Sequence, residues 1–141
     1  MNPSESQEQL PFDLTPEEKA YLAPILAFCT KRAKFANPVT LAYYLNRWNR
    51  LVRNFDHYRG DGEDFANEVS VREILQRDIL IAAPQSLVEK INAALEEPDR
   101  LYREQTSEVD QPWFGRPHES HWWWYRCPEH WAWYRDHAPS A

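Results

Sequence analysis

The C-terminal stretch from Gln111 to Ala141 carries most of the large aromatic side chains of this protein. Six of the seven tryptophans lie there, together with Phe114, Tyr125 and Tyr134. Each large aromatic side chain can bury roughly 150–250 Å² of surface, and burying a large apolar side chain stabilises a folded chain by about 1.5–3 kcal/mol. We therefore expect this stretch either to pack against the rest of the protein or to form a contact surface for a ligand or partner.

The whole chain has the length and composition of a single helical domain. It has 141 residues but only three glycines, which leaves few positions for tight hairpin turns. We expect an all-α fold, a compact bundle of four to six helices with the aromatic-rich, partly irregular C-terminal segment packed against it. The domain should span residues 12–141 and include a Trp/His-rich segment over residues 111–137. Residues 1–11 are polar and acidic and predict a disordered lead-in.

A capping signal begins the first predicted helix. Thr15, Pro16 and Glu18 supply a cap hydroxyl, a proline suited to the first turn and a glutamate that can bond back to the cap. Apolar residues follow at helical spacing. Pro24 lies inside this pattern and is expected to kink or split the helix.

The second predicted helix has the clearest amphipathic pattern. Asn37 is expected as its N-cap and Pro38 as its first residue. Arg47, Arg50 and Arg53 lie on the face opposite the apolar residues. Those apolar residues follow the i, i+3, i+4, i+7 rule and are Leu41, Tyr44, Leu45, Trp48, Leu51, Val52 and Phe55.

Further helices are expected in the second half of the chain. Ser70 and Glu73 have the spacing of a second capping box, with some helix expected before it. Another helix is expected over residues 85–96, and Pro98 is expected to open a separate short turn. Residues 121–127 fit both a short strand and a buried helical turn, and a short helix is expected from Pro128 onward.

The overall charge and the chain ends indicate a soluble protein of the cytoplasm. The net charge of −6 does not favour general binding to nucleic acid. Two cysteines are too few for a disulfide framework, and the N-terminus lacks the pattern of a secretory signal. No apolar run approaches the roughly 20 residues that cross a bilayer, so no membrane association is expected.

Charged residues are unevenly distributed along the chain. Basic residues predominate over residues 31–59, and acidic residues predominate over residues 61–78. The arginine face of the second helix could bind an acidic partner or nucleic acid, because guanidinium groups contact carboxylates and phosphates in pairs. The alternative is that the acidic segment folds back and neutralises the arginines within the protein.

A histidine–cysteine pattern within the aromatic segment is a candidate metal site. His118 and His121 form one pair of potential ligands, and Cys127 and His130 form another. Imidazole nitrogen and thiolate sulfur are the ligands of structural zinc sites. The alternative is that these side chains form hydrogen bonds and packing contacts among the aromatic residues, with Cys127 as a small buried apolar residue.

No combination of residues in the sequence indicates a catalytic centre. We expect a non-enzymatic protein-binding module, of the adaptor, chaperone-like, inhibitor or immunity type, that captures another protein. Its contact surface should combine exposed Trp122, Trp123 and Trp124 with one charged helix face. Two alternatives remain: a zinc-binding or small-molecule-binding protein, and a protein that binds nucleic acid through the arginine face. The aromatic run could equally mediate self-association.

Overall fold

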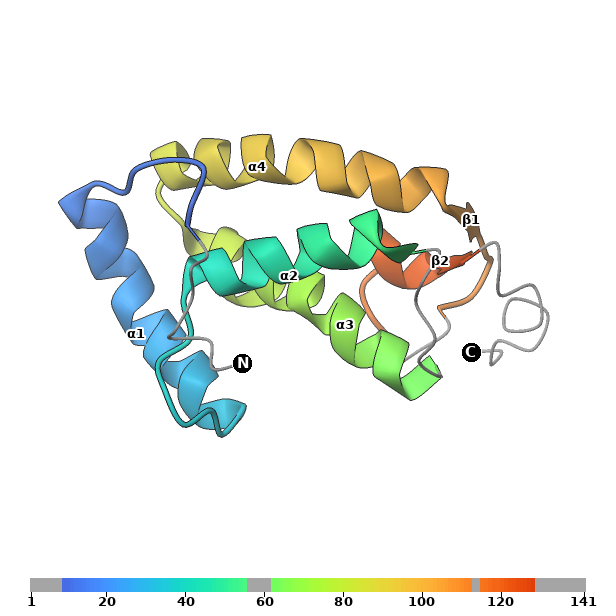
Figure 1. The fold of residues 1–141 in the computed structure, drawn as a ribbon, viewed down its shortest axis with the longest axis horizontal. Helices are drawn as coiled ribbons and strands as arrows, with labels where there is room; N and C mark the ends of the chain where they lie inside the picture. The colour runs from blue at the N-terminus through green and yellow to red at the C-terminus, as the bar shows by residue number, and fades with distance from the viewer. Residues whose placement is uncertain (1–8, 56–61, 113–114, 129–141) are drawn as a thin grey trace.

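The computed structural model describes residues 9–55, 62–112 and 115–128, and these residues are mostly helical (Figure 1). The described α-helices are α1 (Pro16–Arg32), α2 (Leu41–Arg53), α3 (Gly62–Ile74) and α4 (Gln85–Glu104). A π-helical turn, Leu75–Ile79, and a 3-10 turn, Leu80–Ala82, lead from α3 towards α4. The expected all-α fold is confirmed.

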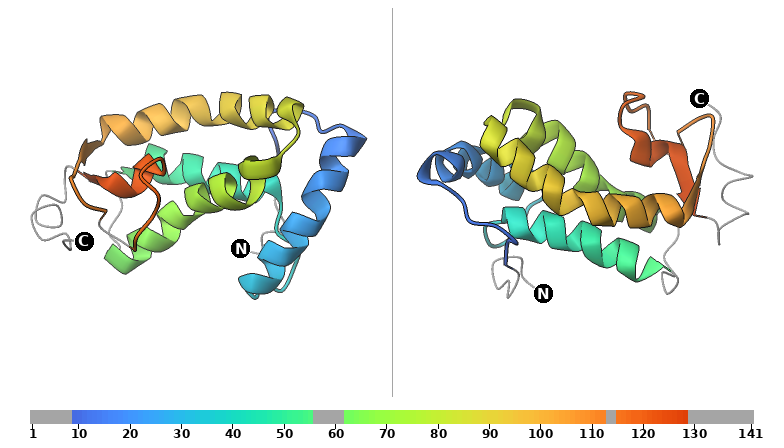
Figure 2. Two further views of the ribbon diagram at one scale, coloured as in Figure 1. Left: turned by 180° about the vertical axis from the view of Figure 1, so that it is seen from behind. Right: turned by 90° about the horizontal axis from the view of Figure 1, so that it is seen from above.

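Helix α2 lies between α3 and α4 and packs against both (Figure 1). Helix α1 crosses one end of this group, as the two further views also show (Figure 2). A small antiparallel strand pair lies at the other end, where β1 (Thr106–Glu108) pairs with β2 (Arg126–Pro128). Ser107 lies opposite Cys127 in this pair. The strand pair joins the end of α4 to the C-terminal segment.

The apolar face of α2 forms the centre of the core. All seven apolar residues predicted from its spacing, from Leu41 to Phe55, are buried, and Trp48 is completely so. They pack against Phe65 and Val69 of α3, Ile91 and Leu95 of α4, and the C-terminal aromatics. The prediction for this face is therefore confirmed, because helical periodicity depends only on residues three and four apart.

The predicted start of the first helix is confirmed, whereas the predicted start of the second is wrong. Thr15 and Glu18 form a reciprocal capping box, and α1 continues through Pro24, which lies on its exposed side. Helix α2 begins at Leu41, and the hydroxyl of Thr40 accepts the hydrogen bond of Tyr43 N. The hydroxyl of Thr30 accepts from Val39 N, so the residues before Thr40 are held outside the helix.

Two boundaries predicted in the second half of the chain are also wrong. Ser70 lies inside α3, and its hydroxyl donates to the carbonyl of Ala66 instead of capping a helix. Helix α4 continues past Pro98, which is buried within it. Burial against the core thus outweighs the local tendency of proline to end a helix.

The aromatic run adopts both of the conformations that its sequence allowed. Residues Trp122–Tyr125 form a 3-10 turn, and strand β2 follows directly. Cys127 and Pro128 belong to that strand, while the helix expected after Pro128 lies outside the described residues, as does most of the lead-in. No helix in the described part of the chain is long and apolar enough to cross a membrane.

Candidate functional site

The structure places the three consecutive tryptophans in different environments. Trp123 and Trp124 are buried in the core, with exposed fractions of 1% and 4%. Trp122 is half-buried, and the guanidinium carbon of Arg103 lies 3.8 Å from the centre of its ring. The expectation that all three are exposed is therefore wrong for Trp123 and Trp124.

The carboxylate of Glu73 on α3 explains why these two tryptophans can be buried. Its Oε1 atom accepts from Trp124 Nε1 at 2.8 Å and from Trp123 Nε1 at 3.3 Å. The Nδ1 atom of His121 lies 3.0 Å from the same oxygen, and the imidazole ring stacks on the Trp123 indole. Buried indole N–H groups require an acceptor, so Glu73 holds the aromatic segment against α3.

A buried ion pair adjoins this carboxylate. Arg72 donates from Nε and Nη2 to Asp99, each at 3.0 Å, and Trp48 Nε1 donates to the same carboxylate at 2.9 Å. The guanidinium carbon of Arg72 lies 4.4 Å from the centre of the Trp123 ring. Together with the Glu73 contacts, this network connects α2, α3, α4 and the C-terminal segment. Its role is structural.

The candidate metal ligands are only partly brought together. The ring centres of His118 and His121 lie 6.2 Å apart, and the Nδ1 atoms bond to Ser120 and Glu73, respectively. Cys127 is buried in β2, and His130 lies outside the described residues. Among the described residues, no group of three or more His, Cys, Asp or Glu side chains could hold a metal ion. Zinc binding by all four residues stays a prediction.

The three arginines of α2 point to different neighbours. Arg53 bonds to Glu97 of α4 at 2.9 Å, whereas Arg47 forms a bidentate ion pair with Glu68 of α3. Arg50 is exposed and shares with Arg47 a hollow between the two helices. The acidic segment therefore does fold back onto Arg47. Arg47 and Arg50 remain together at one surface, while Arg53 lies against α4.

The hollow beside Arg47 has the size of a binding site. It encloses about 410 Å³ between the end of α1, the first half of α2, and α3, and it adjoins a second hollow of about 390 Å³ that also includes Arg47. Ligand pockets typically enclose about 300–1,000 Å³. We call the first hollow the α2–α3 groove; it is lined by Ala33, Phe35, Tyr43, Tyr44, Arg47, Asn67, Ser70, Val71 and Ile74.

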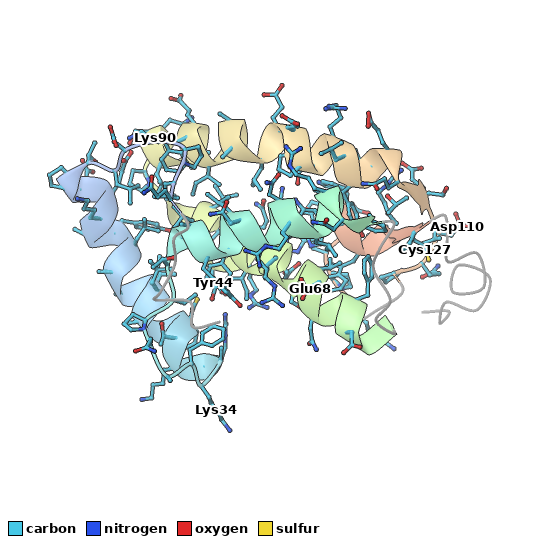
Figure 3. All side chains as sticks on the ribbon, in the orientation of Figure 1. Lys34, Tyr44, Glu68, Lys90, Asp110 and Cys127 are labelled. Atoms are coloured by element: carbon cyan, nitrogen blue, oxygen red, sulfur yellow. The ribbon has the colours of Figure 1, made fainter. Side chains whose placement is uncertain are left out.

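An aromatic wall and a strained turn form one side of the α2–α3 groove. The Phe35 and Tyr43 rings meet edge to face at 5.7 Å, and Tyr44 follows at 5.5 Å. Lys34 has a φ of 59°, a backbone conformation that favours glycine. The turn is closed by hydrogen bonds from Lys34 N to Lys31 O and from Phe35 N to Thr30 O. This turn brings Phe35 to the lining of the groove. It leaves Lys34 exposed at the end of α1, where its side chain projects outward (Figure 3).

Arg47 and Tyr43 are the polar groups at the centre of the groove. The Nη1 atom of Arg47 donates to the Tyr43 hydroxyl at 2.7 Å, while Nε and Nη2 donate to Glu68. Hydrogen bonding to Glu68 raises the pKa of the Arg47 guanidinium, which is therefore charged. The side chain is held from two sides, so its position does not depend on a ligand.

Another hollow of about 540 Å³ lies between the N-terminal segment, α1 and the start of α2. Its lining is mainly aliphatic and includes Leu10, Leu14, Leu22 and Leu41. The segment over it is held by Lys90, whose Nζ donates to Asp13 O at 2.9 Å. This hollow lacks the converging hydrogen-bond donors of the α2–α3 groove.

Among the groove residues, the sequence indicated Arg47 as a binding residue, placed Tyr44 in the core and placed Ser70 at a helix cap. It did not indicate Tyr43 or Phe35, because nothing local in the sequence signals the left-handed turn at the neighbouring Lys34. The opposite charges of residues 31–59 and 61–78 did indicate that these segments could meet. Comparisons with protein-family models, characterised proteins and solved structures yield no match to this chain.

Proposed function

We propose that this protein is a non-enzymatic protein-binding module whose partner docks on the α2–α3 groove. The observation that supports it is the combination, in one hollow, of an aromatic wall with basic side chains. Tyrosine and arginine are enriched where protein interfaces gain most of their binding energy. In this groove, Phe35 and Tyr43 provide apolar area, and Arg47 provides an oriented guanidinium.

The local charge also supports a protein partner. Lys34 and Arg50 are exposed at this surface, whereas the chain as a whole carries a net charge of −6. A basic region on an otherwise acidic protein attracts acidic surfaces of a partner. Nucleic acid is less well supported, because Glu68 compensates Arg47 and Asp78 compensates Arg32, which leaves few cations for phosphates.

Site-specific photocrosslinking in the native host tests the proposal. A photoreactive amino acid is placed at Asn67, an exposed residue that lines the groove, and at Asn92, an exposed residue of α4, as a control. We expect a defined protein adduct from position 67 and none of the same mass from position 92. Adding Lys34→Glu should abolish the adduct, whereas Lys19→Glu on the first half of α1 should preserve it. Equal adducts at both positions, or no effect of Lys34→Glu, would refute this docking site.

A further inference from the structure

We infer that the α2–α3 groove binds a carboxylate side chain of the partner, an aspartate or glutamate that is followed or preceded by an apolar residue. The inference rests on the proposed function and specifies the chemistry of the docking segment. The carboxylate would be held by Tyr43 and Arg47, and the apolar neighbour by the far side of the groove.

Hydrogen-bond donors remain free at the centre of the groove. A guanidinium has five N–H groups, and Arg47 uses three of them, on Glu68 and on the Tyr43 hydroxyl. Because the Tyr43 oxygen accepts a hydrogen bond from Arg47, the Tyr43 O–H group can donate its proton only to a different group. Within the described residues, no acceptor receives that proton. The two side chains therefore present adjacent free donors to an incoming acceptor.

The charges around these donors select for one negative charge. Glu68 holds the Arg47 guanidinium in place and neutralises it, so the pair adds little net charge. Additional positive charge comes from Lys34, an exposed residue whose neighbours in the chain, Ala33 and Phe35, line the groove. A carboxylate, with one negative charge, matches this arrangement, whereas Glu68 would repel a phosphate dianion about twice as strongly. A chain of phosphates would require several uncompensated cations.

The remaining lining explains why an apolar residue should lie beside the carboxylate. Val71 is buried, and Ile74 and Phe35 are half-buried around the same hollow. Covering Ile74 and Phe35 would remove apolar surface from water and contribute about 25 cal/mol per Å². The groove thus offers a polar position and an adjacent apolar position.

The backbone at Lys34 is a separate indication that the groove edge has a function. A residue other than glycine in the left-handed region costs about 1–2 kcal/mol, and glycine is the usual residue at this point of a helix end. Here the strained position carries a lysine at φ 59°. Strain of this kind occurs preferentially at functional sites, and in this protein it lies between Ala33 and Phe35, which line the groove.

Selection of random short peptides on the immobilised full-length protein is the first test. Peptides whose binding is lost on Lys34→Glu and kept on Lys19→Glu are taken as groove ligands. We expect these to be enriched in an acidic residue next to an apolar one. Groove ligands without such enrichment would overturn the carboxylate inference and leave the proposed function standing. If no peptide depends on the groove, both are overturned.

A matched pair of probes then tests the chemistry. The strongest groove peptide and its copy with the acidic residue changed to the corresponding amide are fluorescein-labelled, and their dissociation constants are measured by anisotropy. On the unaltered protein, the acidic peptide should bind about tenfold more tightly, because hydrogen bonds to charged groups are the stronger ones. Tyr43→Phe should remove most of this difference, while Arg100→Gln on α4 should preserve it. Equal binding of the two peptides to the unaltered protein would overturn the inference without reference to any variant.

A labelled single-stranded oligonucleotide of roughly 20 nucleotides serves as the competing probe. We expect it to bind more weakly than the acidic peptide at physiological salt. Tighter binding of the oligonucleotide that is lost on Tyr43→Phe would assign the groove to phosphate and overturn the inference. The thermal midpoint of Tyr43→Phe, expected to stay close to that of the unaltered protein, confirms that only the hydroxyl has been removed.

Discussion

The carboxylate of Glu73 on α3 accepts a 2.8 Å hydrogen bond from the indole nitrogen of Trp124, which follows 51 residues later in the chain. Trp123 donates to the same oxygen, and His121 lies within hydrogen-bonding distance of it. One side chain thus anchors three side chains of the aromatic segment. The candidate docking site is a separate feature of the same helix, because Ser70, Val71 and Ile74 of α3 line the α2–α3 groove.

Replacing the anchor should loosen the aromatic segment from the bundle. Glu73→Ala leaves the indole N–H groups of Trp123 and Trp124 buried without their acceptor. Because an unsatisfied buried polar group costs about 1–3 kcal/mol, we expect the free energy of unfolding in urea to fall by about 2–4 kcal/mol. Glu96→Ala, at an exposed position of α4, is the control and should change it by less than about 0.5 kcal/mol. Equal losses for the two variants would contradict the anchoring role.

The neighbouring tryptophans should differ sharply in their contribution to stability. Trp123 is fully buried, so Trp123→Ala should destabilise the fold by about 3–5 kcal/mol through cavity formation. Trp122 is half-buried and packs on Arg103, so Trp122→Ala should cost about 1 kcal/mol. Chemical denaturation followed by circular dichroism measures both values. If Trp122→Ala lowers the free energy of unfolding more than Trp123→Ala does, the observed burial of Trp123 is contradicted.

The Arg72–Asp99 pair should be sensitive to the loss of one partner. Asp99→Ala leaves a buried guanidinium unpaired and removes the acceptor of Trp48, so we expect a loss of about 3–5 kcal/mol. The double variant with Arg72→Met removes the charge as well and should be more stable than Asp99→Ala alone. If the double variant is less stable than Asp99→Ala alone, the unpaired charge of Arg72 is not the cause of the destabilisation.

The buried carboxylate of Glu18 predicts a defined pH dependence. Hydrogen bonds from Lys90, Ser86 and the backbone of Thr15 lower its pKa from 4.5 to about 2. A lowered pKa in the folded state contributes stability above the unfolded value of 4.5, and this contribution is lost as the pH falls towards 2. The difference in thermal midpoint between the unaltered protein and Glu18→Gln should therefore be constant from pH 7 to 5 and shrink below pH 4.5. If the difference in thermal midpoint is undiminished at pH 2, the lowered pKa of Glu18 is contradicted.

The strained turn at the groove edge should reveal a conflict between stability and binding. Lys34→Gly relieves the left-handed conformation and should raise the free energy of unfolding by about 0.5–1 kcal/mol. The same variant removes the cation and should weaken binding of acidic peptides to the groove. Lys31→Gly, inside the last turn of α1, should destabilise the protein instead, because glycine is unfavourable within a helix.

Several features of this fold could be predicted from neighbouring residues alone. The apolar stripe of α2 and the capping box at Thr15 depend on spacings of three and four residues, and both appear as expected. The predicted interruption at Pro98 failed because Pro98 is buried in a helix whose continuation brings Asp99 to Trp48 and Arg72. The contact between Asp99 and Trp48 spans 51 residues and has no local signal in the sequence.

The sequence by itself determined that this chain is helical and that one face of α2 packs in a core. It also showed that basic and acidic residues lie in different segments of the chain, which could therefore form ion pairs with each other. The tertiary structure decided which aromatic residues are buried and which side chains form the groove. Trp123 and Trp124 entered the core because Glu73 of a distant helix accepts their indole N–H groups. Tyr43 and Arg47 became a docking candidate because Glu68 of α3 pairs with Arg47 and Phe35, which follows the turn at Lys34, packs against the Tyr43 ring. Local spacing determines which face of a helix is apolar, whereas the partners of a polar side chain depend on how distant segments pack.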